Sequence, residues 1–132
     1  MEKLRAIIQH QGGDAGVIDD YRRLPAASGR QLVRAPRGGY LTALDAELVG
    51  RACVALGAGR DRVDDAVDPG VGAMLCAKPG DRLAPGDPIV ELHYQDAARL
   101  GEAMTLIGRA FDIGEKPMVP QPLVIDTVAA DV

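Results

Sequence analysis

The chain has 132 residues, of which 47% are hydrophobic and only four are aromatic, so it can bury one core built mainly from aliphatic side chains. Its net charge of −4 is divided unevenly, with +3 over residues 1–60 and −7 over residues 61–132. No apolar run approaches the roughly 20 residues of a membrane span, and the charged start lacks the apolar stretch of a signal peptide, which predicts a cytoplasmic protein without a membrane partner.

The first residues predict a helix followed by a surface linker. Leu4, Ile7 and Ile8 fall on one face of a helix that a pair of glycines would end. The Asp, Gly, Pro and Ser content of the following residues is typical of surface turns. Because this helix has no N-cap and its apolar face has little nearby to pack against, we expect residues 1–28 to be the end of a larger structure and residues 29–132 to form a separate domain.

The rest of the chain mixes strands and helices without strict alternation, which is typical of an α+β fold. Apolar residues at helical spacing predict a helix that Thr42 or Asp45 caps and Gly57 ends. A second helical pattern begins at Asp96, and a proline-rich connection follows it over residues 112–122. The expected strands cover residues 31–35, 40–41, 72–78, 88–93 and 123–128, and the expected helices cover residues 45–56 and 96–111.

The segment AKPGDRLAPGDPIVEL, residues 77–92, contains the same turn twice. Pro79-Gly80-Asp81 returns six residues later as Pro85-Gly86-Asp87. Proline presets the backbone angle of a tight turn, glycine takes the positive-φ position, and aspartate bonds nearby backbone amides. We therefore expect a structural corner in which Leu83 points inward, and which offers neither a nucleophile nor a base.

The double turn also resembles the corner of biotin- and lipoate-carrying domains, which need an exposed lysine at a hairpin tip. Leu75 stands where a biotin-accepting tetrapeptide would have that lysine, and Lys78 adjoins the first turn instead. A free-standing hammerhead module of biotinyl–lipoyl type, acting in binding or carriage, is the alternative function. A lipoyl or biotinyl mass on Lys78 would support it.

Three other patterns are best explained by structure alone. Gly57-Ala58-Gly59 resembles half of a dinucleotide fingerprint, but it follows a helix and so offers no helix N-terminus to a phosphate. The acidic residues of the next loop are not spaced like a calcium loop and are expected to be solvated. Cys53 and Cys76 have no metal-ligand spacing to the two histidines and are expected to be buried, reduced thiols. The acidic loop residues are Asp61, Asp64, Asp65 and Asp68.

Charged residues elsewhere give two weak candidate sites. Five of the nine basic residues of the first half have no aromatic residues between them, so a solvated or interdomain face is favoured over a nucleic-acid surface. The titratable residues Asp87, Glu91 and His93 are close in sequence, and Glu91 and His93 would share one face of a strand, as a solvent-facing pair. A small independent enzyme built on these three remains an open alternative. The basic residues are Arg22, Arg23, Arg30, Arg34 and Arg37.

Three segments together resemble the C-terminal part of bacterial pyrimidine-nucleoside phosphorylases, the thymidine phosphorylase family. They are QGGDAGVIDD (residues 11–20), VRAPRGGYLTALDAELVGRACVALGAGR (residues 33–60) and DPGVGAMLCAKPGDRLAPGDPIVELHY (residues 68–94). The three occur in the family's order and cover most of the chain. LGAGR and the doubled Gly-Asp turn make the combination specific.

The resemblance implies an α/β-hammerhead domain, a small mixed sheet with two helices related to barrel-sandwich hybrids, preceded by a helix and linker from the end of a central catalytic lobe. Enzymes of the family transfer the pentose of a pyrimidine nucleoside to inorganic phosphate, their co-substrate, and release the free base and a pentose 1-phosphate. Their helical and central lobes carry the phosphate, base and monovalent-cation contacts, and full-length members form homodimers.

No position of this chain matches the family's catalytic motifs. The resemblance therefore assigns it no catalytic, substrate-binding or metal-ligating residue. We expect the isolated chain to be inactive, to need no cofactor, and to pack against the central and helical lobes of a parent enzyme.

Overall fold

The computed structural model describes residues 1–60, 62–118, 124 and 126. Helices and strands are mixed along the chain, as the α+β prediction requires, and no helix among the described residues is long and apolar enough to cross a membrane. The helices are α1 (Glu2–His10), α2 (Ala46–Leu56) and α3 (Ala97–Ala110), with 3₁₀ turns η1 (Ala15–Ile18) and η2 (Tyr21–Arg23). The strands are β1 (Gly29–Arg34), β2 (Gly39–Leu44), β3 (Gly72–Leu75), β4 (Arg82–Leu83), β5 (Pro88–Tyr94) and β6 (Phe111–Gly114).

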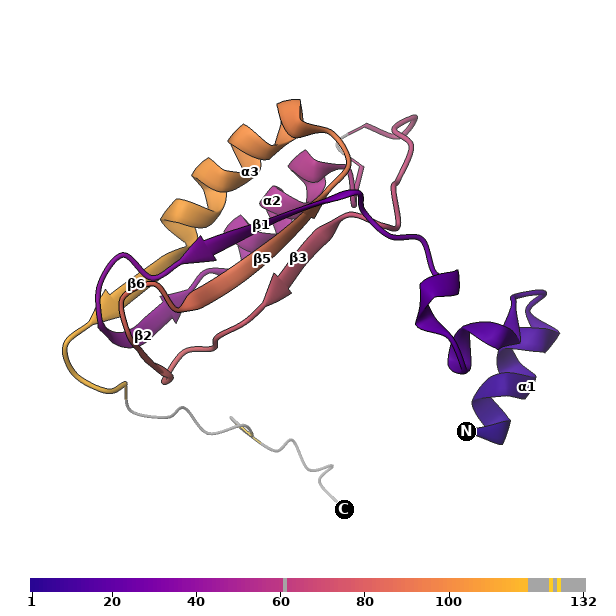
Figure 1. Cartoon of the computed structure of the whole chain (residues 1–132), viewed down its shortest axis with the longest axis horizontal. Helices are drawn as coiled ribbons and strands as arrows, with labels where there is room; N and C mark the ends of the chain where they lie inside the picture. The colour runs from indigo at the N-terminus through magenta and orange to yellow at the C-terminus, as the bar shows by residue number, and fades with distance from the viewer. Residues whose placement is uncertain (61, 119–123, 125, 127–132) are drawn as a thin grey trace, which may run out of the picture.

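The strands form two three-stranded antiparallel sheets, ordered β1-β5-β3 and β4-β2-β6. Figure 1 shows α2 and α3 lying side by side along the first sheet. The two helices are antiparallel, because the amide of Asp45, before α2, donates to the carbonyl of Ala110, the last residue of α3, at 2.7 Å. The α+β class is confirmed.

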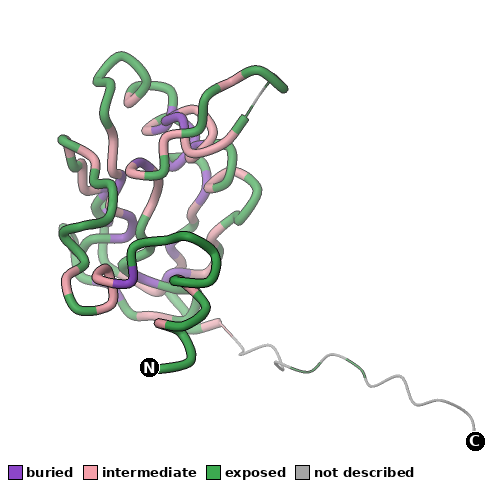
Figure 2. The backbone as a smooth tube through the Cα atoms, turned by 90° about the vertical axis from the view of Figure 1, so that its right-hand side faces the viewer, coloured by how far each residue is buried: buried purple, intermediate pink, exposed green. Residues whose placement is uncertain are grey.

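The core lies between this helix pair and the sheets. Its largest fully buried side chains are aliphatic, as a sequence with few aromatic residues requires, and they come from β2, β5 and α3. Small residues, Ala52 of α2 and Ala103 of α3, are also fully buried and let the two helices approach closely. In Figure 2 the buried segments gather inside the domain. The largest of these side chains are Leu41, Ile89, Val90, Leu92 and Ile107.

The predicted ends of α2 are confirmed. The carboxylate of Asp45 accepts from the amide of Leu48 at 3.0 Å, which makes Asp45, and not Thr42, the N-cap. Gly57 follows the helix with a φ of +105°, and this left-handed conformation ends α2. The carboxylate of Asp96 caps α3 by accepting from the amide of Ala98.

The C-terminal end of α3 and the connection after it correct the sequence prediction. The helix ends at Ala110, and Phe111 begins β6, which pairs with β2 through Leu44 opposite Phe111. The residues immediately after the helix were expected to be a loop, because the short run Phe111–Gly114 is too brief to show an alternating pattern. Its strand character comes from the tertiary pairing with β2. The strand expected over 123–128 lies outside the described residues, apart from Val124 and Asp126.

The double turn forms the corner that the sequence predicts. Gly80 and Gly86 have φ values of +100° and +88°, and each aspartate accepts a backbone hydrogen bond, Asp81 from Lys78 at 2.9 Å and Asp87 from Ala84 at 2.7 Å. Between the turns, the two-residue strand β4 pairs with β2. It holds the side chain of Leu83 at 7% exposure, so the inward direction of Leu83 is confirmed.

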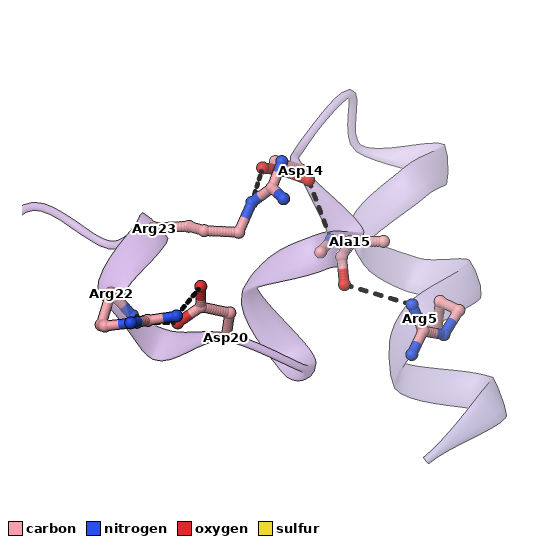
Figure 3. A network of polar contacts seen from close by, with 7 residues as sticks. Arg5, Asp14, Ala15, Asp20, Arg22 and Arg23 are labelled. Carbon is pink, nitrogen blue, oxygen red and sulfur yellow. Dashed lines mark hydrogen bonds and ion pairs between the residues drawn. The ribbon is translucent and has the colours of Figure 1, made fainter.

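The N-terminal segment, residues 1–24, stands apart from the sheets in Figure 1. Its helix α1 has no side-chain cap and no buried residue, and Leu4 and Ile7 are exposed, as the unpaired apolar stripe predicts. Arginine–aspartate contacts fix the fold of this segment (Figure 3): Arg23 donates to Asp14, and Arg22 donates to Asp20, each at 2.8 Å.

Candidate functional site

The most concentrated polar group on the sheets consists of Arg30, Glu91 and His93. His93 Nε2 lies 2.7 Å from Glu91 Oε1, and Arg30 Nη1 lies 3.6 Å from the same oxygen. The structure thus brings together two of the three titratable residues that the sequence groups. Asp87 is elsewhere, because its carboxylate is bound in the second tight turn.

The register of β1, β5 and β3 explains this grouping. Glu91 and His93 alternate with the fully buried Val90 and Leu92, so they share the other face of β5. Arg30 of β1 lies opposite His93. On the other side of β5, Gly72 of β3 lies opposite His93 and fills no space beside the imidazole, since a Cβ there would meet nothing within 4 Å.

The missing side chain at Gly72 leaves a hollow of about 190 Å³, lined by Gly70–Met74 and His93. The side chains of Glu91 and His93 are 17% and 26% exposed, so the pair that was predicted to face solvent is only partly exposed. Their shared face is confirmed. Glu91 Oε1 faces both the imidazole of His93 and the guanidinium of Arg30. The carboxylate therefore orients His93, and this oxygen is not free to bind a substrate.

Each of the five arginines of the candidate basic face has an acidic or carbonyl partner. Arg22 and Arg23 belong to the N-terminal network, and Arg30 faces Glu91. Arg34 donates to the carbonyl of Gly86 at 2.9 Å, and Arg37 donates to the carbonyl of Ile113. These contacts tie β1 and the loop after it to the double turn and to β6, and they support a structural role over a nucleic-acid surface.

The acidic loop and the glycine-rich segment before it bring no ligand set together. Asp65 accepts from the amide of Arg62 at 2.8 Å, and Asp68 accepts from the amide of Gly70 at 2.8 Å. Asp61 lies outside the described residues. Among the described residues, no group of three or more His, Cys, Asp or Glu side chains is placed to hold a metal ion. Gly57–Gly59 follow the C-terminal end of α2, as expected.

The carrier-like corner has its exposed apolar residue where a carrier would need an amine. Leu75 ends β3 and is 52% exposed, whereas Lys78 lies in the first turn and its backbone amide is bound to Asp81. The corner therefore has the double turn, with Leu75 and not a lysine at the exposed position.

The two cysteines differ in exposure, and the prediction of two buried thiols is wrong for Cys76 and only partly met by Cys53, which is half-buried. Cys76 follows the edge strand β3 and is exposed, with its Sγ 3.8 Å from the carbonyl of Met74. Cys53 is half-buried on α2, and burial raises the pKa of its thiol. The sequence gives both cysteines an apolar setting, but it does not show that β3 lies at a sheet edge.

A groove between α2 and α3 was not anticipated from the sequence. Arg51 of α2, Arg60 of the following loop and Glu102 of α3 line it over an apolar floor. The available signal was the position of Arg51 one helical turn before Val54 and Ala55, on the flank of the apolar face of α2.

The sequence of this chain matches a known protein family and several curated proteins. The model of the pyrimidine nucleoside phosphorylase C-terminal domain family matches residues 40–114, which run from β2 to β6. The chain is 38% identical over 93 residues to the pyrimidine-nucleoside phosphorylase of Bacillus subtilis (strain 168) and 39% identical to that of Staphylococcus aureus (strain USA300). The corresponding enzyme of Staphylococcus epidermidis is 34% identical.

Each of these matches covers 70% of this chain and 22% of the relative. The chain therefore spans about a fifth of the length of the curated relatives it matches.

Proposed function

Because this chain belongs to the pyrimidine-nucleoside phosphorylase family, we propose that it serves as the non-catalytic C-terminal domain of such an enzyme. The parent enzyme transfers the pentose of a pyrimidine nucleoside to inorganic phosphate and releases the free base and a pentose 1-phosphate. Residues 29–132 form an α/β-hammerhead domain within it, and residues 1–28 belong to the end of the central lobe.

The observation that carries this proposal is the match of residues 40–114 to the family's C-terminal domain. It includes the double turn and both helices of the helix pair, so most of the residues that make the core lie in the part the family shares. Phosphorolysis needs donors that hold phosphate and donors that steady the departing base. The polar groups on the sheet are instead engaged with one another, as Arg30, Glu91 and His93 are.

The exposed apolar residues of the N-terminal segment support a role in packing against further lobes. Leu4 and Ile7 of α1 are exposed, as are Tyr21 and Leu24 at η2. The Arg5–Asp19 contact at 2.8 Å holds α1 against the turns that follow, so the segment presents these side chains on a folded support. Burying them against the rest of the central lobe removes apolar surface from water and fixes the N-terminal segment within that lobe. In this proposal, it is the full-length parent enzyme that forms a homodimer.

An assay of the isolated chain tests the non-catalytic assignment. The chain is incubated with inorganic phosphate and either thymidine or uridine, and free base is measured by chromatography. The Bacillus subtilis enzyme under the same conditions is the positive control. We expect no release above the blank, and release of free base by the purified chain alone would refute the assignment.

A further inference from the structure

The groove between α2 and α3 combines unpaired cationic groups with an apolar floor. Its volume is about 370 Å³, within the range of small-molecule sites. It lies on the helix pair, away from the Arg30–Glu91–His93 group on the sheet. Its lining residues are Arg51, Val54 and Ala55 of α2, Arg60 of the next loop, and Glu102 and Leu106 of α3.

The two arginines of the groove have side-chain donors to spare. Within the part of the chain that the structure describes, Arg51 makes no ion pair and no side-chain hydrogen bond, and Arg60 donates once, to the carbonyl of Val63 at 3.4 Å. By contrast, Arg22 and Arg23 each bind an aspartate. A guanidinium has five N–H donors, so most of the donors of Arg51 and Arg60 are available to a ligand.

The other lining residues of the groove are apolar or acidic, and they limit which ligands fit it. Leu106 is buried and Val54 and Ala55 are half-buried, so they form an apolar floor that strengthens polar contacts above it by limiting water. Glu102 is exposed on the opposite helix and forms no ion pair with either arginine. Its carboxylate repels a simple anion but accepts a hydrogen bond from an amine or hydroxyl of the same ligand.

We propose that this groove binds a phosphorylated small molecule that carries an amine or hydroxyl near its phosphate. The phosphate lies between the guanidinium groups of Arg51 and Arg60, because two forks approaching from α2 and the loop match the several oxygens of a phosphate group. The amine or hydroxyl donates to Glu102. This site is separate from the proposed role of the chain as a non-catalytic domain and requires no catalytic lobe.

The test is a titration of the isotope-labelled chain followed by amide NMR at constant ionic strength. Two probes are used, inorganic phosphate and O-phosphoethanolamine, which adds an ammonium group to the phosphate. We expect saturable shifts at Val54, Ala55 and Leu106, with tighter binding of phosphoethanolamine. Sodium chloride at matched ionic strength should give none of these saturable shifts.

Three variants separate the proposal from a general charge effect. The double variant Arg51→Gln, Arg60→Gln should weaken phosphoethanolamine binding by about tenfold or more, because it removes charge-assisted hydrogen bonds. Glu102→Gln should tighten inorganic phosphate and remove the advantage of phosphoethanolamine. Arg109→Gln changes an exposed arginine of α3 outside the groove and should leave both affinities unchanged.

Several results would contradict the proposed binding of a phosphorylated ligand in the groove. Shifts that grow linearly without saturation, that sodium chloride reproduces, or that persist in the double variant would overturn the proposal. An equal loss in Arg109→Gln would overturn it as well, since that loss would reflect net charge.

Discussion

Gly39 of β2 and Gly114 of β6 approach so closely that no side chain fits at Gly39. A Cβ built on Gly39 would lie 2.5 Å from the carbonyl oxygen of Gly114, and Gly39 has a φ of +150°. Both facts require glycine, because the blocking atom is backbone and the conformation is one that L-residues rarely adopt. This contact lets β2 pair with β4 on one side and β6 on the other.

Gly39→Ala should therefore destabilise the chain by about 2 kcal/mol or more, since β6 must shift away from β2. The measurement is urea denaturation followed by circular dichroism. The control is Gly101→Ala in α3, where a Cβ meets nothing within 4 Å and where alanine favours the helix by up to about 1 kcal/mol. Equal midpoints for the two variants would contradict the account of the β2–β6 contact.

Leu83→Asp tests the corner made by the double turn. Leu83 is 7% exposed, so an aspartate there buries an unpaired charge and should lower the free energy of unfolding by about 3 kcal/mol or more. Leu75→Asp is the matched control, because Leu75 is half-exposed and should cost at most about 1 kcal/mol. If thermal melting found the two variants equally stable, Leu83 would not belong to the core.

The two cysteines should react at different rates with a thiol reagent. Cys76 is exposed, whereas Cys53 is half-buried with its thiol pKa raised, so less of its reactive thiolate is present near pH 7.5. We expect a fast phase from Cys76 and a slow phase from Cys53, measured by release of thionitrobenzoate from Ellman's reagent. Cys76→Ser should remove the fast phase alone, and a fast phase that survives in this variant would contradict the assigned exposures.

The contacts of Asp14 in the N-terminal segment should persist at pH values below the usual pKa of aspartate. The hydrogen bond from the amide of Gly16 and the contact with Arg23 lower the pKa of Asp14 below its usual value of about 3.9. Because the folded pKa is the lower one, the stabilisation is complete above the usual value and is lost as the pH falls through the folded pKa.

The amide proton shift of Gly16, followed by NMR between neutral and strongly acidic pH, reports this titration. Its midpoint should lie below about 3.9, and Asp14→Asn should abolish the transition. A midpoint at or above the usual value would show that the contacts of Asp14 drawn in Figure 3 do not persist in solution.

Local signals in the sequence predicted the parts of the fold that local chemistry determines. Asp45 and Gly57 bound α2 because a cap and a left-handed glycine act within one helical turn. The double turn followed from its own Pro-Gly-Asp residues for the same reason. The strand at Phe111 and the exposure of Cys76 depend on which strands pair, and no local pattern encodes the neighbours of β2 or the edge position of β3.

Among the polar groups, too, some features follow from local sequence and others from tertiary packing. The shared face of Glu91 and His93 follows from strand alternation, whereas the approach of Arg30 and the gap at Gly72 depend on the register of three strands. The groove at Arg51 and Arg60 depends on the packing of α2 against α3, which separate segments of the chain provide.

We propose above all that this chain completes a pyrimidine-nucleoside phosphorylase without supplying its catalytic residues. The most direct measurement compares the Bacillus subtilis enzyme truncated before its matching C-terminal region with a chimera in which this chain replaces that region. We expect the chimera to phosphorolyse thymidine or uridine well above the truncated enzyme. A folded chimera with no more activity than the truncated enzyme would contradict the claim.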